Sequence, residues 1–505
     1  TVVGHLAGVN EGEHLRLTGV WKNHPRFGRQ FQVESYEFIH PETVEGIEKY
    51  LASGLIRGVG PVTAERIVSA FGGKTLEVID REPERLSEVP GLGAKRIALI
   101  RDAWQEQRGI RRAMVFLQGH GLGGSLAARI WKVYREKTVE LVSQNPYCLV
   151  DDIQGIGFAT ADRIAGNLGV LPDSPLRLAS GLEYSIETFE GRGHTCAPLD
   201  RMLDEGSRLL GVNIETLRPA LENLVQAGRL IVRNDLVSGA VFIYSSRCYH
   251  AEENAVSRIE SILNTGKELL PDYGLAGWDK ELKTFEQENG LCLSSGQMEA
   301  IRGALRDRIA VITGGPGTGK TTVVAALIDV AEKARIRVVL AAPTGRAAKR
   351  MSETSGGRAA STIHRLLGWS FQDGQFLHNR IRPLEGEIFV LDEVSMVDLP
   401  LFASFLDAIP YGAALILVGD VDQLPSIGPG TVLKDLIESG VLPVYRLDEI
   451  FRQAGQSLII RNAHRIRRGM VPLERDPELD TGNLSVEGEP GRRDFFLMPQ
   501  NDPDT

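Results

Sequence analysis

The chain has 505 residues, 42% of them hydrophobic and 24% charged, a composition typical of soluble globular proteins and enough length for several domains. No run of about 18 apolar residues occurs, which excludes a predicted membrane-spanning helix. The formal net charge of −9 argues against a protein whose whole surface coats nucleic acid, although a local basic channel remains compatible with it.

The four cysteines lie far apart in the sequence, and no CxxC pair occurs among them. The spacing therefore carries no zinc or iron–sulfur signature, and we expect reduced thiols in a cytoplasmic protein. The chain begins "TVVGHLAGVNEG", without an initiator Met and without a signal-peptide pattern, so we expect a trimmed chain.

Residues 1–45 are predicted to form a small β segment. The stretches "HLRLTGVW" and "QFQVESYEFI" alternate polar and apolar residues, and "KNHPRFGRQ" between them is predicted as a turn. Short alternating strands are typical of a small barrel or sandwich, and an oligonucleotide-binding (OB) barrel is one candidate.

Residues 46–170 contain an internal repeat with a period of about 30–34 residues, which indicates stacked supersecondary units. Four copies share a Gly-apolar-Gly turn followed by a helix start, and their first glycines are Gly58, Gly91, Gly121 and Gly155. The unit resembles the helix-hairpin-helix element. Glycine lets the turn approach a partner closely, and the free N–H groups of the next helix suit a phosphate. The hairpins either contact the DNA backbone or only pack helices together.

Residues 171–255 are predicted to be helical and then to form a two-stranded wing. Helical stretches such as "RLASGLEYSIETF" precede the apolar segments "RLIVRN" and "AVFIYSS". Helices followed by a wing would give a winged-helix-like region.

A phosphate-binding loop is the most informative motif in the chain. The apolar residues 309–312 predict a buried strand, "GGPGTGKT" follows, and a helix comes next, which is the context that such a loop requires. Its backbone N–H groups would surround the β-phosphate of ATP, Lys320 would neutralise phosphate oxygens and Thr321 would bind Mg²⁺. The predicted nucleotide-binding residues of the loop are Gly315, Pro316, Gly317, Thr318, Gly319, Lys320, Thr321 and Thr322.

A second predicted strand, residues 387–391, ends in two acidic residues. After a phosphate-binding loop, Asp392 is predicted to hold Mg²⁺ and Glu393 to polarise the attacking water. A third strand in "AALILVGDVDQL" is followed by Gln423, which can reach the γ-phosphate, and "RVVLAAP" predicts a fourth. Strands alternating with helices predict an α/β fold with a parallel sheet and helices on both faces.

The ordered motifs resemble those of superfamily 1 helicases. "LSSGQMEAI", "GGPGTGKTT", "APTGRAAKRM", "LDEVSMVD", "VGDVDQLPSIGPG" and "LDEIFRQ" resemble the Q motif and motifs I, Ia, II, III and IV. The resemblance implies that Gln297 reads the adenine and that Arg452 contacts the γ-phosphate from a second RecA-like domain. It also implies a first RecA-like ATPase domain at residues 256–445.

"STIHRLL", "IFRQAGQSLIIRNAHRIRRG" and the helix-hairpin-helix array resemble the RecD-like branch, the alpha-subunit family of exonuclease V, in its stand-alone long form. That branch moves 5′ to 3′ on single-stranded DNA and unwinds duplex. Residues 446–505 then correspond to only the start of a second RecA-like domain, since motifs V and VI do not follow. We therefore expect a truncated chain.

The insertion at residues 357–386 contains "WSFQDGQFLH". Asp373-Gly374 is the preferred pair of a two-residue type I′ turn, which would pair Phe371 with Phe376. By resemblance to this branch, the hairpin is a pin at the point where the duplex splits; otherwise it only packs on its own domain. The candidate DNA-binding residues are Thr344, Arg346, His364, Phe371 and Phe376.

The sequence therefore predicts a monomeric, ATP- and Mg²⁺-dependent DNA helicase that acts on single-stranded DNA and on single-strand/duplex junctions, without a membrane, in repair or recombination. A DNA-stimulated ATPase that acts as a binding or loading switch, without unwinding, is the main alternative. A nuclease or relaxase fusion lacks a visible carboxylate cluster or Tyr–His set, and helix-hairpin-helix repeats favour DNA over RNA.

Overall fold

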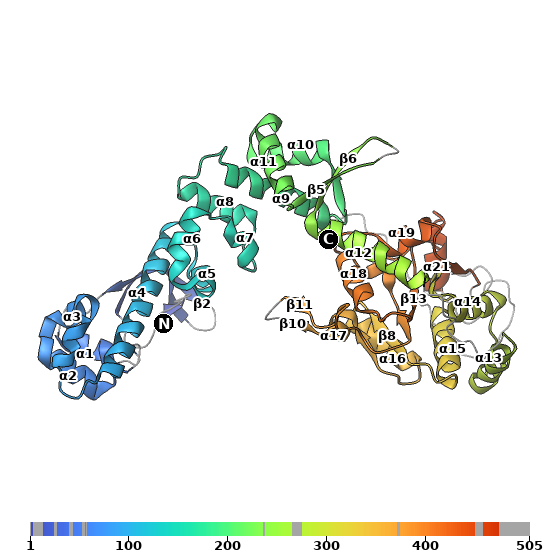
Figure 1. Ribbon diagram of the computed structural model, residues 1–505, viewed down its shortest axis with the longest axis horizontal. Coiled ribbons are helices and arrows are strands. Elements are labelled where there is room, and N and C mark those ends of the chain that lie inside the picture. Colours follow the sequence, from blue (N-terminus) through green and yellow to red (C-terminus); the bar gives the residue numbers. More distant parts are fainter. Residues whose placement is uncertain are drawn as a thin grey trace. The chain divides into compact units, whose positions relative to one another are not determined.

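The computed structural model describes residues 2–3, 14–24, 28–39, 44–52, 56, 58–235, 238–264, 275–370, 374–449 and 458–473. The chain forms two compact units (Figure 1). Unit 1 comprises Thr1–Tyr184 and Glu205–Leu221, and unit 2 comprises Ser185–Asp204 and Glu222–Thr505.

Unit 1 begins with a three-stranded sheet in the order β1-β3-β2, formed by β1 (Val2–Val3), β2 (His14–His24) and β3 (Gly28–Ile39). The predicted β segment is confirmed, but residues 22–24 and 28–30, predicted as turn, continue the strands. An antiparallel register shift falls between Thr18 and Gly19. A Cβ atom on Gly19 would lie 2.0 Å from the Gln32 carbonyl oxygen, so this irregularity requires glycine.

Helices make up the rest of the first unit up to residue 170. The α-helices are α1 (Val44–Ala52), α2 (Pro61–Phe71), α3 (Thr75–Arg81), α4 (Ala94–Gly119), α5 (Gly124–Tyr134), α6 (Thr138–Gln144), α7 (Cys148–Asp152) and α8 (Phe158–Asn167). Short 3-10 helices join them: η1 (Gly72–Lys74), η2 (Pro83–Glu88) and η3 (Arg135–Lys137). The predicted helical array is confirmed.

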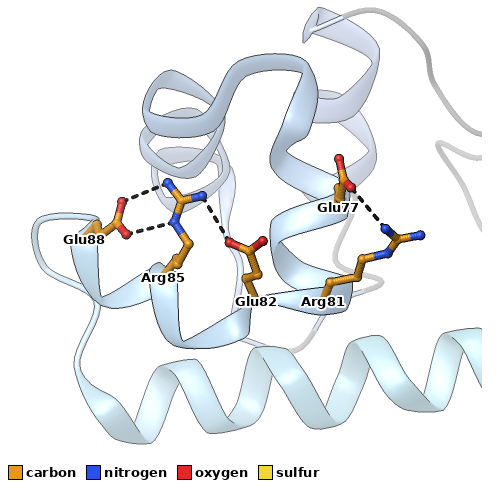
Figure 2. A network of polar contacts seen from close by, with 5 residues as sticks. All are labelled: Glu77, Arg81, Glu82, Arg85 and Glu88. Atoms are coloured by element: carbon orange, nitrogen blue, oxygen red, sulfur yellow. Dashed lines mark hydrogen bonds and ion pairs between the residues drawn. The ribbon is translucent and has the colours of Figure 1, made fainter.

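The connection between the first two hairpins carries a network of exposed ion pairs (Figure 2). Arg85 pairs with Glu88 at 2.9 Å and with Glu82 at 3.2 Å, while Arg81 pairs with Glu77 at 3.4 Å. Hydrogen bonding to the Arg85 guanidinium lowers the pKa of the Glu88 carboxyl. Exposed pairs of this kind stabilise a fold only weakly, so the apolar core between these helices holds the unit together.

Helices and a three-stranded antiparallel sheet follow, whereas the sequence predicted a wing of only two strands after the helices. The sheet order is β4-β6-β5. The elements are α9 (Pro175–Gly191), β4 (Cys196–Pro198), α10 (Leu199–Leu210), α11 (Ile214–Gln226), β5 (Leu230–Asn234), β6 (Val241–Ser245) and α12 (Ser246–Leu263).

The second unit contains a six-stranded, wholly parallel sheet in the order β14-β7-β13-β12-β8-β9. Its central strands are apolar and buried because helices cover both faces. The strands are β7 (Ile309–Gly314), β8 (Val338–Ala342), β9 (Ala360–Thr362), β12 (Ile388–Leu391), β13 (Ala414–Gly419) and β14 (Val444–Leu447).

Two separate apolar clusters show that helices cover both faces of this sheet, as predicted (Figure 1). One face packs against α12, α17 (Ile363–Leu367), α18 (Leu399–Ala408) and α19 (Val432–Glu438). The other packs against α13 (Leu275–Asn289), α14 (Ser295–Arg306), α15 (Lys320–Lys333) and α16 (Gly345–Thr354). The outer strands β9 and β14 were not predicted.

A buried arginine joins α12 to α18, one of the helices that cover the six-stranded sheet. Arg258 is 8% exposed, and its guanidinium donates to the carbonyl oxygens of Leu406 and Ile409 at the end of α18. Burial lowers the pKa of Arg258, and the two carbonyls replace the water that this cation has lost. The helix that follows the wing is thereby fixed to the domain that carries the phosphate-binding loop.

Candidate functional site

The phosphate-binding loop connects the buried strand β7 to α15. Gly317 and Gly319 have φ values of +77° and +84°, which glycine adopts without strain. Gly319 is the N-cap of α15 and supplies no side-chain cap, so the first N–H groups of this helix are available to a ligand. The loop therefore has the geometry of an anion-binding helix start.

Lys320 is directed back onto its own loop. Its ammonium donates to the carbonyl oxygens of Gly314, at 2.5 Å, and Gly315, at 3.2 Å. Burial lowers the pKa of Lys320, and the nearby carboxylates of Asp420, Glu393 and Asp392 oppose this effect. A bound phosphate carries negative charge and would bind the ammonium more strongly than these neutral carbonyl groups do. The ammonium would therefore turn from the carbonyls toward the phosphate.

Asp392 and Glu393 follow directly after β12, at the carboxyl edge of the sheet. Burial raises the pKa of both carboxyls, and the charge of Asp392 raises that of Glu393 further. Glu393 has a φ of +54°, a strained value for a residue with a side chain, and its N–H donates to Asp392 Oδ1 at 2.9 Å. Strain and repulsion at one point are typical of a site built for a ligand rather than for stability.

Gln423 lies in the turn that follows β13. Asp420 at the start of this turn is buried, and its carbonyl and Oδ1 accept the N–H groups of Gln423 and Asp422 at 3.2 and 3.1 Å. Since β12 and β13 are adjacent and parallel, the turn lies beside the two acidic residues.

These elements enclose one cavity of about 1160 Å³. It is lined by all the predicted loop residues 315–322, by both acidic residues and by Gln423. The sequence did not point to the remaining lining residues, which are Asn289, Gly290, Leu291, Cys292, Arg350 and Ile460. The sequence did contain a signal for Arg350. This residue lies on α16, the helix that follows β8, and β8 ends at the same edge of the sheet as the strands before the loop and the acidic pair.

Gln297 lies beside the loop but is not among the residues that line the cavity. Its side chain is buried, donates to the Thr318 carbonyl at 3.3 Å and accepts the Ser294 N–H at 3.0 Å. Ser294 in turn accepts the Gln297 N–H, so the two residues form a capping box at the start of α14. The observed role of this glutamine is to support the phosphate-binding loop; its contact with adenine stays a prediction.

The candidate DNA-binding residues have different surroundings. Thr344 accepts the Ala347 N–H and caps α16, which leaves less of its side chain for a ligand, whereas Arg346 is exposed. His364 is exposed and lies in an aromatic cluster with Trp369 and Phe376. Arg452 and Phe371 lie outside the described residues.

The hairpin of residues 369–376 has a different register from the predicted one. β10 (Trp369–Ser370) pairs with β11 (Gln375–Phe376), and Trp369 lies opposite Phe376. The predicted pairing of Phe371 with Phe376 through a two-residue turn is therefore wrong, because four residues separate the paired ends. The Trp369 and Phe376 rings are 4.8 Å apart, and His364 lies 5.7 Å from Phe376.

The helix-hairpin-helix turns of the first unit have four equivalent glycines. Gly58, Gly91, Gly121 and Gly155 all have φ values between +84° and +95°, as the predicted turns require. The helices that follow, α2, α4, α5 and α8, all start at glycine N-caps without a side-chain cap, and no atom would lie within 4 Å of a Cβ at these N-caps.

The four hairpins form two similar pairs. Arg66 of the first copy lies against the second hairpin, 3.0 Å from a Cβ placed on Gly91. Arg129, at the same position of the third copy, lies 3.4 Å from a Cβ placed on Gly155. Each pair therefore combines free helix N–H groups with a nearby guanidinium, a combination suited to phosphates.

The described ranges contain neither a long apolar helix nor a cluster of metal ligands. No helix in them has the length and apolar character to cross a membrane. Within the same ranges, no three His, Cys, Asp or Glu side chains gather as a metal site would require, and all four cysteines are free thiols.

Four family models match the chain in succession. The OB-fold domain of the ATP-dependent DNA helicase YrrC matches residues 1–41, and a SAM-like helix-hairpin-helix tandem matches 49–106. The HHH domain of the ATP-dependent RecD2 DNA helicase matches 106–196, and an AAA domain matches 297–429.

Similar proteins come from several bacteria. The ATP-dependent RecD2 DNA helicase of Deinococcus radiodurans is 32% identical over 509 residues, which cover 99% of this chain and 69% of that protein. The RecBCD enzyme subunit RecD of Mycobacterium tuberculosis is 43% identical over 164 residues, or 28% of each chain. RecD of Haemophilus influenzae is 29% identical over 49% of this chain and 45% of its own.

Among solved structures, the Pif1 helicase from Candida albicans is 27% identical, with a TM-score of 0.29 over 36% of this chain and 45% of that one. The parallel sheet order and the match to an AAA domain together show the RecA-like α/β fold of residues 297–429.

Proposed function

Because the chain belongs to the family of ATP-dependent RecD2 DNA helicases, we propose that it couples ATP hydrolysis to 5′–3′ movement on single-stranded DNA and to duplex unwinding. The observation that carries the proposal is the cavity in which the phosphate-binding loop, Asp392, Glu393 and Gln423 lie together. We infer that the protein acts as a monomer in the cytoplasm of a bacterium, in DNA repair or recombination.

The residues of the cavity suit a nucleoside triphosphate with Mg²⁺. Mg²⁺ usually takes one or two protein oxygens and completes its shell with water and phosphate oxygens. Thr321, at the start of α15, and Asp392, a carboxyl whose pKa is raised by burial, would supply those two oxygens. The bound ion would neutralise phosphate charge, while Lys320 holds the β- and γ-phosphates.

Glu393 is the proposed base for the attacking water, and Gln423 the residue that contacts the γ-phosphate. The raised pKa of Glu393 makes it a better proton acceptor than an exposed carboxylate, provided that it is ionised at the working pH. Loss of the γ-phosphate would release Gln423, so the turn after β13 would change between the ATP and ADP states.

DNA would be held along both units. The paired hairpins, with Arg66 and Arg129, would contact phosphates, and such contacts make affinity fall steeply with salt. On the motor domain, Arg346 and His364 would hold the single strand, and the hairpin beyond Trp369 would separate the strands of the duplex.

Arg452 is proposed to contact the γ-phosphate from the start of the second RecA-like domain. We expect Arg452→Ala to lower ATP turnover about 10³-fold, the lower end of the range for arginine fingers, with little change in ATP affinity. Steady-state ATPase assays with saturating single-stranded DNA measure both quantities. Normal turnover by this variant would remove Arg452 from the site.

The decisive experiment compares duplexes that carry a 5′ or a 3′ single-stranded tail, with ATP and Mg²⁺. Unwinding from the 5′ tail, dependent on hydrolysable ATP, is the expected result. Unwinding only from the 3′ tail would contradict the proposed polarity. ATP hydrolysis that DNA stimulates, without displacement from either tail, would instead support a binding or loading switch.

A further inference from the structure

Helix α21 (Leu458–Arg467) lies on the phosphate-binding loop through one of its faces. Ile460 lines the nucleotide cavity, His464 contacts the Pro316 carbonyl, and Arg467 pairs with Asp422. These residues are spaced i, i+4 and i+7, the spacing that places side chains on one side of a helix. The contact face is therefore continuous over two turns.

The His464 contact depends on a glycine of the loop. The carbonyl oxygen of Pro316 can only accept, so His464 Nε2, 3.0 Å away, donates. A Cβ atom on Gly315 would lie 2.7 Å from His464 Cε1, closer than carbon atoms tolerate. Gly315 thus allows the histidine to reach the loop backbone.

The Arg467 contact reaches the turn that carries Gln423. Arg467 Nε lies 2.6 Å from Asp422 Oδ2, and both side chains are about 40% exposed (41% and 42%). Asp422 and Gln423 are consecutive in a turn anchored by Asp420. The carboxylate of Asp422 pairs with Arg467 of α21, whereas Gln423 lines the cavity, so consecutive residues of one turn contact the helix and the cavity.

The helix itself is firmly built at its other contacts. Asn462 is fully buried and exchanges two hydrogen bonds with Leu473, at 2.8 and 2.7 Å. A helix of ten residues has little stability alone in water, so its contacts with the rest of the domain, those with the loop among them, hold it in place.

We propose that His464 and Arg467 are positioning residues for ATP hydrolysis: Arg467 holds Asp422 so that Gln423 faces the phosphate cavity, and His464 fixes α21 to the loop. The inference deepens the proposed function and rests on it for the role of Gln423. Through this helix, the chain beyond the motor sheet would respond to the nucleotide in the cavity.

A charge-swap experiment tests the pair. We expect Arg467→Glu to lower kcat of the DNA-stimulated ATPase about fivefold, the effect of one partly exposed ion pair, and to change KM for ATP less than about twofold. Asp422→Arg should act similarly, and the double variant should recover to within about twofold of the unmodified protein. His464→Gln, which keeps an N–H donor, should retain more activity than His464→Leu.

Arg468→Glu is the matched control, since it makes the same change of charge one residue further along the chain. It should leave kcat within about twofold. Equal losses in Arg467→Glu and Arg468→Glu, or no recovery in the double variant, would overturn the assignment.

Amide hydrogen exchange provides a readout that does not need catalysis. In the nucleotide-free protein, Arg467→Glu should speed exchange about fivefold in α21 and in the turn at Asp422, and Arg468→Glu should not. Unchanged exchange in Arg467→Glu would refute the inference even if the protein is an active helicase. An unmodified protein that hydrolyses no ATP would refute the proposed function, while the exchange result would still decide the contact.

Discussion

Replacing Glu393 with glutamine is expected to lower DNA-stimulated ATP turnover by about 10²–10⁴-fold, the usual contribution of a general base. Glutamine keeps the size and polarity of the side chain but cannot take a proton. ATP affinity should stay within about threefold, because the substitution leaves Lys320 and the loop N–H groups, the proposed phosphate contacts, unchanged. Steady-state ATPase assays and equilibrium binding of a fluorescent ATP analogue measure the two effects.

The same substitution should raise the stability of the nucleotide-free protein. Burial holds the pKa of Glu393 above its ordinary value of 4.5, so the folded state binds the proton more tightly than the unfolded state does. The stability that this proton provides is present below the ordinary value and is lost as pH rises through the raised one. Glutamine does not ionise, so the Glu393→Gln protein does not lose this stability as pH rises. Its melting temperature should therefore exceed that of the unmodified protein by more at pH 7 than at pH 4.

Glu353→Gln is a suitable control, because Glu353 is exposed on α16 and forms only a long pair with Lys349, at 3.9 Å. It should leave turnover unchanged. Turnover by Glu393→Gln within about threefold of the unmodified protein would show that another group accepts the proton.

The four inner strands of the motor sheet could be predicted because each is a short, continuous apolar run, as buried parallel strands require. The two outer strands could not. β9 is Ala-Ser-Thr, and β14 contains Arg446 between apolar residues, so neither has a strong local pattern. Each becomes a strand by pairing with an element 18 or more residues away, which no local periodicity records.

The candidate site likewise has residues that could be predicted from the sequence and residues that could not. The phosphate-binding loop and the acidic pair could be predicted, since the chemistry requires those residues in that order along strand ends. The contact face of α21 could not, although the spacing of Ile460, His464 and Arg467 is visible in the sequence, because its partners lie more than 40 residues away. The sequence also contains a local signal for a structural role of Gln297, because Ser294 three residues before it allows a capping box. The motif resemblance implied only a contact with adenine.

The hairpin register shows tertiary packing prevailing over turn preference. Asp373-Gly374 favours a two-residue turn, but Phe376 packs against the buried cluster of the sheet and lies opposite Trp369. These aromatic contacts fix the register of the two paired ends. His364, itself a candidate DNA-binding residue, contacts both rings at the base of the hairpin.

Replacing residues 371–373 with Gly-Ser-Gly is expected to lower DNA unwinding at least tenfold and to leave DNA-stimulated ATP hydrolysis within about twofold. The change removes Phe371 from the segment between the two paired strands, called the tip here, and keeps the paired base, Trp369 with Phe376, in place. If the tip separates the strands, the motor would still move along single-stranded DNA but would stall at the duplex. Strand displacement and ATPase rates, measured on the same tailed duplex, give both values.

Phe376→Ala distinguishes this role from simple packing. Phe376 is half-buried against the core, so its truncation should destabilise the domain by about 2 kcal/mol, roughly half the loss for a fully buried ring. The tip replacement should leave the melting temperature within a degree or two of the unmodified protein. A hairpin that serves only packing predicts the opposite pattern: normal unwinding after the tip replacement, and loss of both activities, in parallel with stability, after Phe376→Ala.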